Sequence, residues 1–166
     1  IFLVSQPVTE LSKIQSKPIN IPNVKITNSI DMAARTGKIK FPCRINLSLE
    51  EIKDFSLVFY NEKGEKLIIG YDKIQNQYFI DRTKSGKTEF QKEFGARHVA
   101  PRLTDNNKLS ISLLIDVSSV ELFADDGLTA MTAIFFPNKP YNQIHIQSTE
   151  NAVIKNMEYI NLKSGR

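Results

Sequence analysis

The sequence has no tryptophan, one cysteine and only two histidines among its 166 residues. A single cysteine, Cys43, cannot form a disulfide within the chain, so cysteine usage leaves the cellular compartment open. His98 and His145 are far apart, and neither has a Cys or His at the spacing of a zinc site. We therefore expect no metal and no cofactor.

Long apolar runs and a strong charge of either sign are also missing. No segment approaches the roughly 18 apolar residues that span a membrane, so none is predicted to do so. The 22 basic and 18 acidic residues are interleaved and leave a net charge of +4. Such a weak, unclustered balance does not predict nucleic-acid binding.

The residues that are present favour strands. Apolar side chains occupy every odd position from Ile39 to Leu49, with Pro42 on the opposite face. A proline inside a strand indicates an edge position or a bulge. Cys43 belongs to this apolar stripe and is predicted to be buried. Further strands are predicted at residues 55–59, 67–71, 77–80, 144–147 and 153–162. Short strands with hardly any helix predict an all-β fold of two antiparallel sheets, a β-sandwich of the concanavalin A-like or jelly-roll type.

Residues 109–137 hold the most informative pattern. Alternating apolar residues predict strands at 109–115 and 120–124. Asp125-Asp126-Gly127 then supplies turn chemistry, because Gly accepts the positive φ that such turns need. Two adjacent Asp in a tight turn cannot provide the six or more oxygens of a calcium site. A return strand at 128–136 places its even-numbered residues on one side and is stopped by Pro137.

The N-terminal segment differs from the rest. Val8, Leu11 and Ile14 are three residues apart, which predicts a short helix that ends before Pro18. We therefore divide the chain into a linker, residues 1–18, and a sandwich domain, residues 19–166. A frayed terminal arm is the alternative for the linker.

Two blocks of residues resemble a known family. The first reads Asp-Val-Ser-Ser-Val-Glu-Leu-Phe from Asp116, followed by Asp125-Asp126-Gly127, Met131-Thr132 and Phe136-Pro137. The second has Ile-Gly-Tyr-Asp from Ile69, Phe-Ile-Asp-Arg from Phe79, Ser85-Gly86, and Ala-Pro-Arg from Ala100. In order and spacing they resemble the C-terminal β-sandwich of glycoside hydrolase family 32, the invertases, inulinases and levanases. The resemblance covers nearly the whole chain and is weakest at residues 19–35.

The resemblance also implies what this chain lacks. The family's catalytic five-bladed propeller precedes the sandwich and carries three acidic motifs, which resemble Trp-Met-Asn-Asp-Pro, Arg-Asp-Pro and Glu-Cys. This sequence has no Trp and no Arg-Asp-Pro, and Cys43 follows a proline. Retaining glycosidases need two carboxylates about 5 Å apart, and no pair here matches those motifs. We expect no catalytic residue in this chain.

The resemblance therefore implies a non-catalytic module of a fructan- or sucrose-cleaving hydrolase. Its expected partner is the propeller, which it would pack against and stabilise, and homodimer formation is a further possibility. The chain opens with Ile1 and lacks a signal-peptide layout, so we expect a fragment whose targeting sequence lies elsewhere. The substrate class implies a secreted, periplasmic or cell-surface location. Because the partner is missing, exposed apolar residues are expected to gather on one face.

Ser118 and Ser119, with His98 and Asp116, provide the residue types of a Ser-His-Asp triad. The Gly-x-Ser-x-Gly nucleophile motif is absent. We expect instead a turn or bulge in which the two hydroxyls bond the local backbone. Glu121 alternates with Val120 and Leu122 and should point to the outer face. By the resemblance, it is a polar contact at the domain junction.

Asp81-Arg82 follows a predicted strand and leads into a turn. A guanidinium holds a carboxylate through two parallel hydrogen bonds, so Arg82 is predicted to clamp a loop or a neighbouring domain, with ligand contact as the alternative. The complete set of candidate interface or structural residues is Asp81, Arg82, Asp116, Ser118, Ser119, Glu121, Asp126 and Gly127.

A second functional hypothesis is an independent fructan-binding module. Sugar sites combine an aromatic platform with planar polar side chains. Tyr60, Tyr71, Tyr78 and Tyr141 are the available platforms. The candidate sugar contacts are Tyr71, Asp72, Tyr78 and Arg82. Exposed, co-planar rings would favour this hypothesis, and buried rings would remove its basis.

Overall fold

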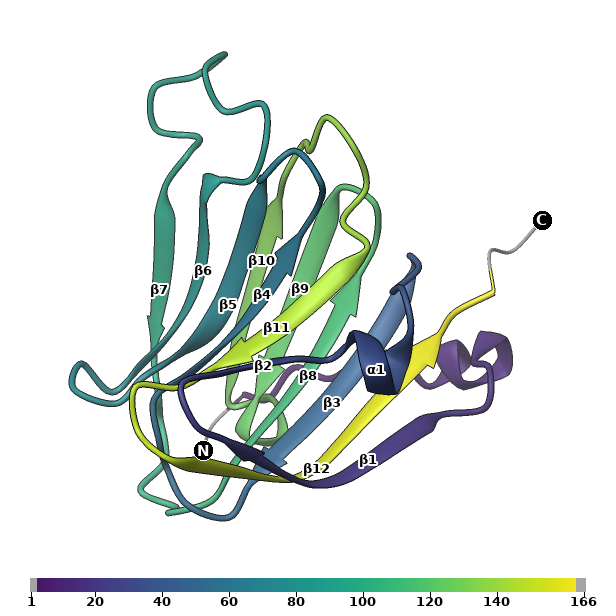
Figure 1. The fold of residues 1–166 in the computed structure, drawn as a ribbon. Helices are drawn as coiled ribbons and strands as arrows, with labels where there is room; N and C mark the ends of the chain where they lie inside the picture. Colours follow the sequence, from purple (N-terminus) through teal and green to yellow (C-terminus); the bar gives the residue numbers. More distant parts are fainter. Residues whose placement is uncertain (1–2, 164–166) are drawn as a thin grey trace.

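The computed structural model describes residues 3–163 and contains two six-stranded antiparallel sheets packed face to face (Figure 1). The first sheet consists, in order, of β1 (Ile19–Ile26), β12 (Ala152–Asn161), β3 (Cys43–Leu49), β8 (Leu109–Ile115), β9 (Ser119–Ala124) and β10 (Thr129–Ile134). The second consists of β2 (Ser29–Asp31), β11 (Gln143–Gln147), β4 (Phe55–Tyr60), β5 (Lys66–Asp72), β6 (Gln77–Lys84) and β7 (Arg97–Pro101). The predicted all-β sandwich is confirmed.

The core lies between the sheets and follows the alternation read from the sequence. In β3 and β8 every second residue is buried, and the register pairs Ile45 with Leu113 and Leu47 with Ile111. A one-residue slip would turn all these side chains to solvent, so the buried face fixes the register. Cys43 is buried as predicted, and burial raises the pKa of its thiol to about 12.

The prediction for Pro42 is wrong. The strand begins after it, at Cys43, and β3 lies in the middle of its sheet between β12 and β8 rather than at an edge. A proline lacks the N–H that a central strand needs, but just before the first paired residue it has no ladder bond to supply.

Three strands were not predicted, β1, β2 and β7. β1 and β7 are edge strands, and β2 is both an edge strand and only three residues long. Pro22 lies within β1, and most of β7 is exposed. Edge strands tolerate proline and bury less of their length, so their sequences carry a weak alternation.

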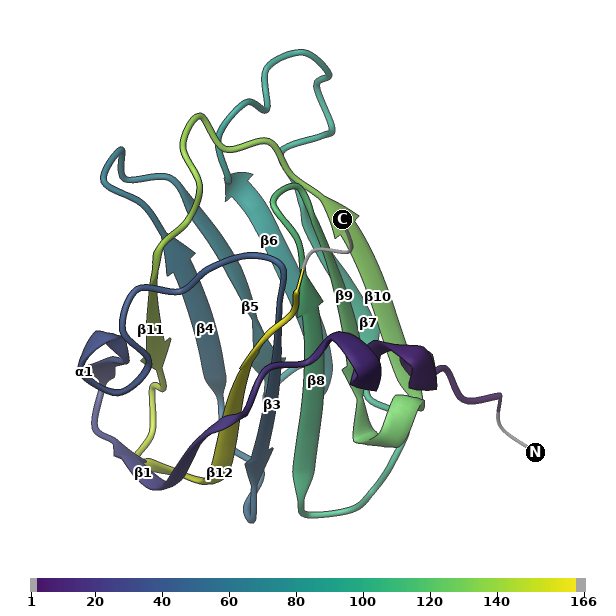
Figure 2. The same cartoon turned by 90° about the vertical axis from the view of Figure 1, so that its right-hand side faces the viewer.

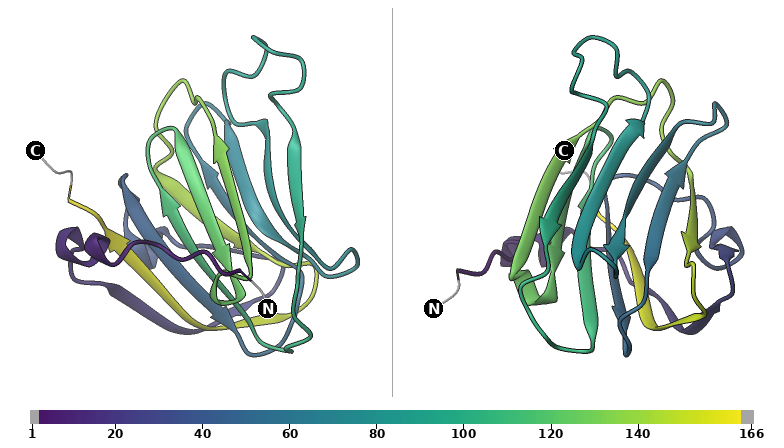
Figure 3. Two further views of the ribbon diagram at one scale, coloured as in Figure 1. Left: turned by 180° about the vertical axis from the view of Figure 1, so that it is seen from behind. Right: turned by 90° about the vertical axis from the view of Figure 1, so that its left-hand side faces the viewer.

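The N-terminal segment forms a 3₁₀-helix, η1 (Thr9–Ile14). Spacing of three residues is the period of a 3₁₀-helix, which explains the pattern of Val8, Leu11 and Ile14. Figure 2 shows η1 on the viewer's side of the first sheet. Before it, residues 3–8 cross the outer face of that sheet toward β10, as the left view of Figure 3 shows. We call residues 3–8 the N-terminal arm. The division at residue 18 stays a prediction, although β1 begins at Ile19.

Candidate functional site

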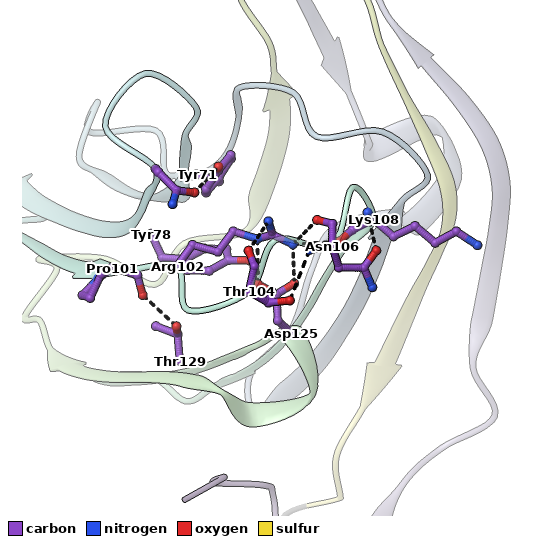
Figure 4. A network of polar contacts seen from close by, with 10 residues as sticks. Tyr71, Tyr78, Pro101, Arg102, Thr104, Asn106, Lys108, Asp125 and Thr129 are labelled. Atoms are coloured by element: carbon purple, nitrogen blue, oxygen red, sulfur yellow. Dashed lines mark hydrogen bonds and ion pairs between the residues drawn. The ribbon is translucent and has the colours of Figure 1, made fainter. Parts of the chain in front are cut away.

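A buried ion pair ties the two sheets together at one end of the sandwich (Figure 4). Arg102 follows β7, and Asp125 opens the 3₁₀ turn η2 (Asp125–Gly127) between β9 and β10. The Nε of Arg102 donates to Asp125 Oδ2 at 2.8 Å, and Nη2 donates to Oδ1 at 3.3 Å. The Tyr78 hydroxyl, from β6, donates to the same Oδ2 at 2.7 Å. Arg102 is 5% exposed and Asp125 7%.

The remaining donors of Arg102 organise the loop that follows it. Nη1 donates to the carbonyl of Thr104 at 2.9 Å, and Nη2 donates to those of Asn106 and Lys108 at 2.7 and 2.9 Å. Burial alone would lower the pKa of Arg102, but its bonds to Asp125 and Tyr78 outweigh burial and raise it. Burial and the bond to Asp125 raise the pKa of Tyr78. Neither group exchanges a proton near neutral pH, so this network is structural.

In the turn η2, Gly127 has the predicted positive φ, and the two preceding aspartates have a positive φ as well. Asp125, Asp126 and Gly127 have φ of +48°, +58° and +89°. A Cβ at Gly127 would lie 2.0 Å from the carbonyl oxygen of Ser5, whose N–H donates to the Gly127 carbonyl at 3.0 Å. Only glycine therefore lets the N-terminal arm lie this close. Asp126 is exposed, and its carbonyl accepts a bond from Gln6.

Arg82 bridges the two sheets at the opposite end. Its Nη1 donates to the carbonyl of Ile134 in β10 at 2.9 Å, and its guanidinium lies 4.1 Å from the ring centre of Phe94. Burial lowers the pKa of Arg82, and within residues 3–163 its buried Nε has no hydrogen-bond partner. Asp81 does not pair with Arg82. Its carboxylate accepts bonds from the N–H and hydroxyl of Thr83.

Apolar side chains gather on the surface beside Arg82. Phe90, Phe94 and Phe136, which we call the aromatic cluster, have ring centres 4.5 to 5.9 Å apart. Phe90 is 63% exposed, and Ile134, two residues before Phe136, is also exposed. The loop between β6 and β7, which carries Phe90 and Phe94, projects above the sandwich in Figure 1. Other exposed apolar residues lie elsewhere, on the N-terminal arm, in β12 and at Ile74, so the expected gathering on one face stays a prediction.

Asp116, Ser118 and Ser119 form the hairpin between β8 and β9. Their backbone makes the contacts: Asp116 N–H donates to the Ser119 carbonyl, and Phe135 N–H donates to that of Ser118, both at 2.9 Å. The predicted turn is present. The predicted bonds of the two hydroxyls to backbone are absent among residues 3–163. No hydrogen bond in that range joins these residues to His98. Glu121 is exposed, as predicted.

Of the candidate sugar contacts, Tyr71 and Tyr78 do not form an exposed aromatic platform. Tyr71 and Tyr78 are buried against the opposite sheet, Tyr141 is buried, and Tyr60 is only partly exposed beside His145. Three of the four rings are therefore closed to solvent, which removes the basis given for a tyrosine platform. Tyr71 and Asp72 line one groove of about 610 Å³ on the second sheet, whereas Arg82 lies toward the other end of β6.

Two kinds of feature, a metal centre and a membrane-spanning helix, are absent from the described residues. No group of three His, Cys, Asp or Glu residues that could hold a metal ion occurs within residues 3–163. In the same range, no helix has both the length and the apolar character needed to cross a membrane.

Known proteins similar to this chain include a levanase and an exo-inulinase. The levanase of Bacillus sp. (strain L7) is 26% identical over 136 residues, which make up 80% of this chain and 15% of the levanase. The extracellular exo-inulinase of Aspergillus awamori is 35% identical over 152 residues, 89% of this chain and 28% of that protein. The chain thus spans less than a third of either relative.

Solved structures share the fold. The crystal structure of exo-inulinase from Aspergillus awamori matches with a TM-score of 0.80 at 24% identity, covering 98% of this chain and 33% of that one. Fructan 1-exohydrolase IIa from Cichorium intybus matches with a TM-score of 0.78 at 14% identity, covering 98% and 38%. The family model described as "Glycosyl hydrolases family 32 C terminal" matches residues 8–161. The chain therefore belongs to glycosyl hydrolase family 32, as a C-terminal domain of that family.

Proposed function

We propose that this chain is the non-catalytic C-terminal module of a fructan- or sucrose-hydrolysing enzyme and that it packs against and stabilises the catalytic domain. The match of residues 8–161 to the C-terminal family model carries this proposal, together with the small share of each relative that the chain spans. The absence of the three acidic motifs from the sequence supports a supporting rather than a catalytic role.

The catalytic domain docks on the outer face of the first sheet along β10. The family's catalytic domain precedes the sandwich, so the N-terminal arm points to where it lies. That arm is fixed at Gly127, immediately before β10. At the other end of β10, Ile134 is exposed, and so is Phe136, which belongs to the aromatic cluster. Exposed apolar surface of this kind marks an interaction site.

Several of the predicted interface residues surround β10. Asp126 and Gly127 precede it, Glu121 lies opposite Thr132 in the sheet register, and Ser118 bonds the backbone just after it. Asp116 and Ser119 belong to the same hairpin as Ser118. Arg82, from the second sheet, donates to the carbonyl of Ile134 in β10. Their contact with the catalytic domain is part of this proposal.

The test compares this chain alone with a protein in which the catalytic domain precedes it. Hydrogen exchange of residues 85–96 and 129–136 should slow in the two-domain protein, because the partner shields that surface. Phe90→Ser together with Phe136→Ser should lower the melting temperature of the catalytic domain. Ile74→Ser, which removes an exposed apolar side chain of the second sheet, is the matched control and should leave it unchanged. Equal exchange in both proteins would contradict the proposed face.

A second copy of this chain is the competing occupant of the same face. Light scattering of the two-domain protein separates the cases, because docking within one polypeptide leaves a monomer and pairing through β10 gives a dimer sensitive to Phe90→Ser.

The Aspergillus awamori exo-inulinase is described as extracellular. Because this chain is similar to that protein, we propose that the enzyme that contains it also acts outside the cytoplasm.

A further inference from the structure

We propose that the groove on the outer face of the second sheet binds a neutral oligosaccharide. The groove has a volume of about 610 Å³ and runs across β11, β4, β5 and β6. Three of its lining residues, Gln147, Ser56 and Phe79, belong to one row of the sheet register, in which Gly70 stands between Ser56 and Phe79. Because the two middle members of this row are small, the sheet surface is hollowed between Gln147 and Phe79.

Gly70 shapes that hollow. A Cβ at this position would lie 2.2 Å from the Phe55 carbonyl oxygen and 2.9 Å from Cζ of Phe79. Glycine therefore lets the Phe79 ring lean over β5 and form one apolar wall. The volume falls within the range of small-ligand sites, which are mostly apolar with a few well-placed polar groups.

Arg97 and Asp72 are the polar groups that such a ligand would meet. The guanidinium carbon of Arg97 lies 3.8 Å from the centre of the Phe79 ring, a cation–π contact that restrains the side chain. Its Nη2 is 3.6 Å from Asp72 Oδ2, an ion pair but longer than a hydrogen bond. Within residues 3–163 no other ion pair or hydrogen bond engages the Arg97 side chain. The guanidinium donors of Arg97 thus lie beside a carboxylate acceptor, and both side chains are partly exposed.

This pairing suits two neighbouring hydroxyl groups of a sugar. One hydroxyl accepts from the guanidinium while the next donates to the carboxylate, and both protein groups keep their charge. Asp72 is already held in place, since its other oxygen accepts from the N–H of Gln75 at 3.0 Å. Asp54, Asp72 and Arg97 are the charged residues of the lining, so the groove has no positive excess that would favour an anion.

Ile74 supplies the apolar surface that a sugar ring needs. It stands in the hairpin between β5 and β6, lines the groove and is 86% exposed. Folding gains nothing from a large apolar side chain there, whereas the C–H face of a sugar ring packs against one. The groove lies on the second sheet and the proposed docking face lies on the first, so sugar binding here does not depend on the docking proposal.

The experiment is a calorimetric titration of this chain with inulin-type and levan-type oligosaccharides, combined with NMR mapping of the perturbed residues. Saturable binding with a dissociation constant of about 1 mM is expected for so shallow a site. Arg97→Met keeps the cover over Phe79 but removes the donors, and should weaken binding about tenfold. Ile74→Ser should weaken it about threefold to tenfold.

Val99→Ser is the matched control. Val99 is exposed and lies on the same face of β7 as Arg97, but it does not line the groove. It should leave affinity unchanged, as should Phe90→Ser on the docking face. Perturbed NMR signals at Ile74, Gln75 and Phe79 would place the ligand in the groove even if one variant failed to fold. Absence of saturable binding would overturn the proposal, and so would binding that persists in both Arg97→Met and Ile74→Ser or maps elsewhere.

Discussion

Two arginines bridge the two sheets at opposite ends of the sandwich, and they do so in different ways. Arg102 is buried, pairs with Asp125 and places three further bonds on backbone carbonyls. Arg82 has no carboxylate partner in the described residues, makes one bond to a carbonyl and rests on Phe94. Their pKa values are shifted in opposite directions, upward for Arg102 and downward for Arg82.

We call the end of the sandwich at Arg102 the closed end and the end at Arg82 the open end. At the closed end the charge, the hydroxyl of Tyr78 and the loop carbonyls satisfy each other inside the domain. At the open end a partly buried cation lies on the buried ring of Phe94, beside the exposed Phe90 and Phe136, which the proposed catalytic domain would cover. Stability should therefore depend on the first end, and association on the second.

The largest expected effect is at Asp125. Asp125→Asn keeps the shape and tolerates the positive φ, but it leaves Arg102 as a buried charge without a counter-ion. The free energy of unfolding, measured by urea titration, should fall by about 3–5 kcal/mol. Asp126→Asn is the matched control, because Asp126 is the exposed neighbour with a similar φ. It should change stability by less than about 0.5 kcal/mol, and equal losses in the two variants would argue against the buried pair.

Tyr78→Phe should have the next largest effect. It removes one bond to Asp125 while Arg102 remains, so about 1.5–3 kcal/mol should be lost at pH 8. The folded pKa of Tyr78 lies above its ordinary value of 10.0. Its contribution is therefore complete below pH 10 and is lost as pH rises further, because only the unfolded chain releases the proton.

Urea titrations at pH 8 and pH 11 check this sign. The gap in stability between the native chain and Tyr78→Phe should narrow at the higher pH. Tyr141 and Cys43, whose pKa values burial also raises, titrate in both proteins and cancel in the difference. A gap that widens with pH would contradict the assignment.

Alternation predicted the central strands but not this network. β3 and β8 were predictable because one face of each is buried and the other is not. In β6, Tyr78, Phe79 and Ile80 are all buried, so the sequence does not tell which of them faces the core. Asp125 resembled a solvated turn residue, since its partner lies 23 positions earlier and only the fold brings them together. The signal available was the joint presence of Ala-Pro-Arg and Asp-Asp-Gly in the two family blocks.

The smallest of these effects is expected at the open end. Arg82→Met keeps a flexible apolar stem over Phe94 and removes the bond to the Ile134 carbonyl, so about 0.5–1.5 kcal/mol should be lost. Arg97→Met is the control, because Arg97 also lies on a phenylalanine ring but donates to no backbone carbonyl among the described residues. It should cost less, about 0.5 kcal/mol or below. Thermal unfolding of the two variants side by side decides the point: equal shifts would mean that Arg82 contributes only stacking, whereas a larger shift for Arg82→Met assigns the difference to the bridge between the sheets.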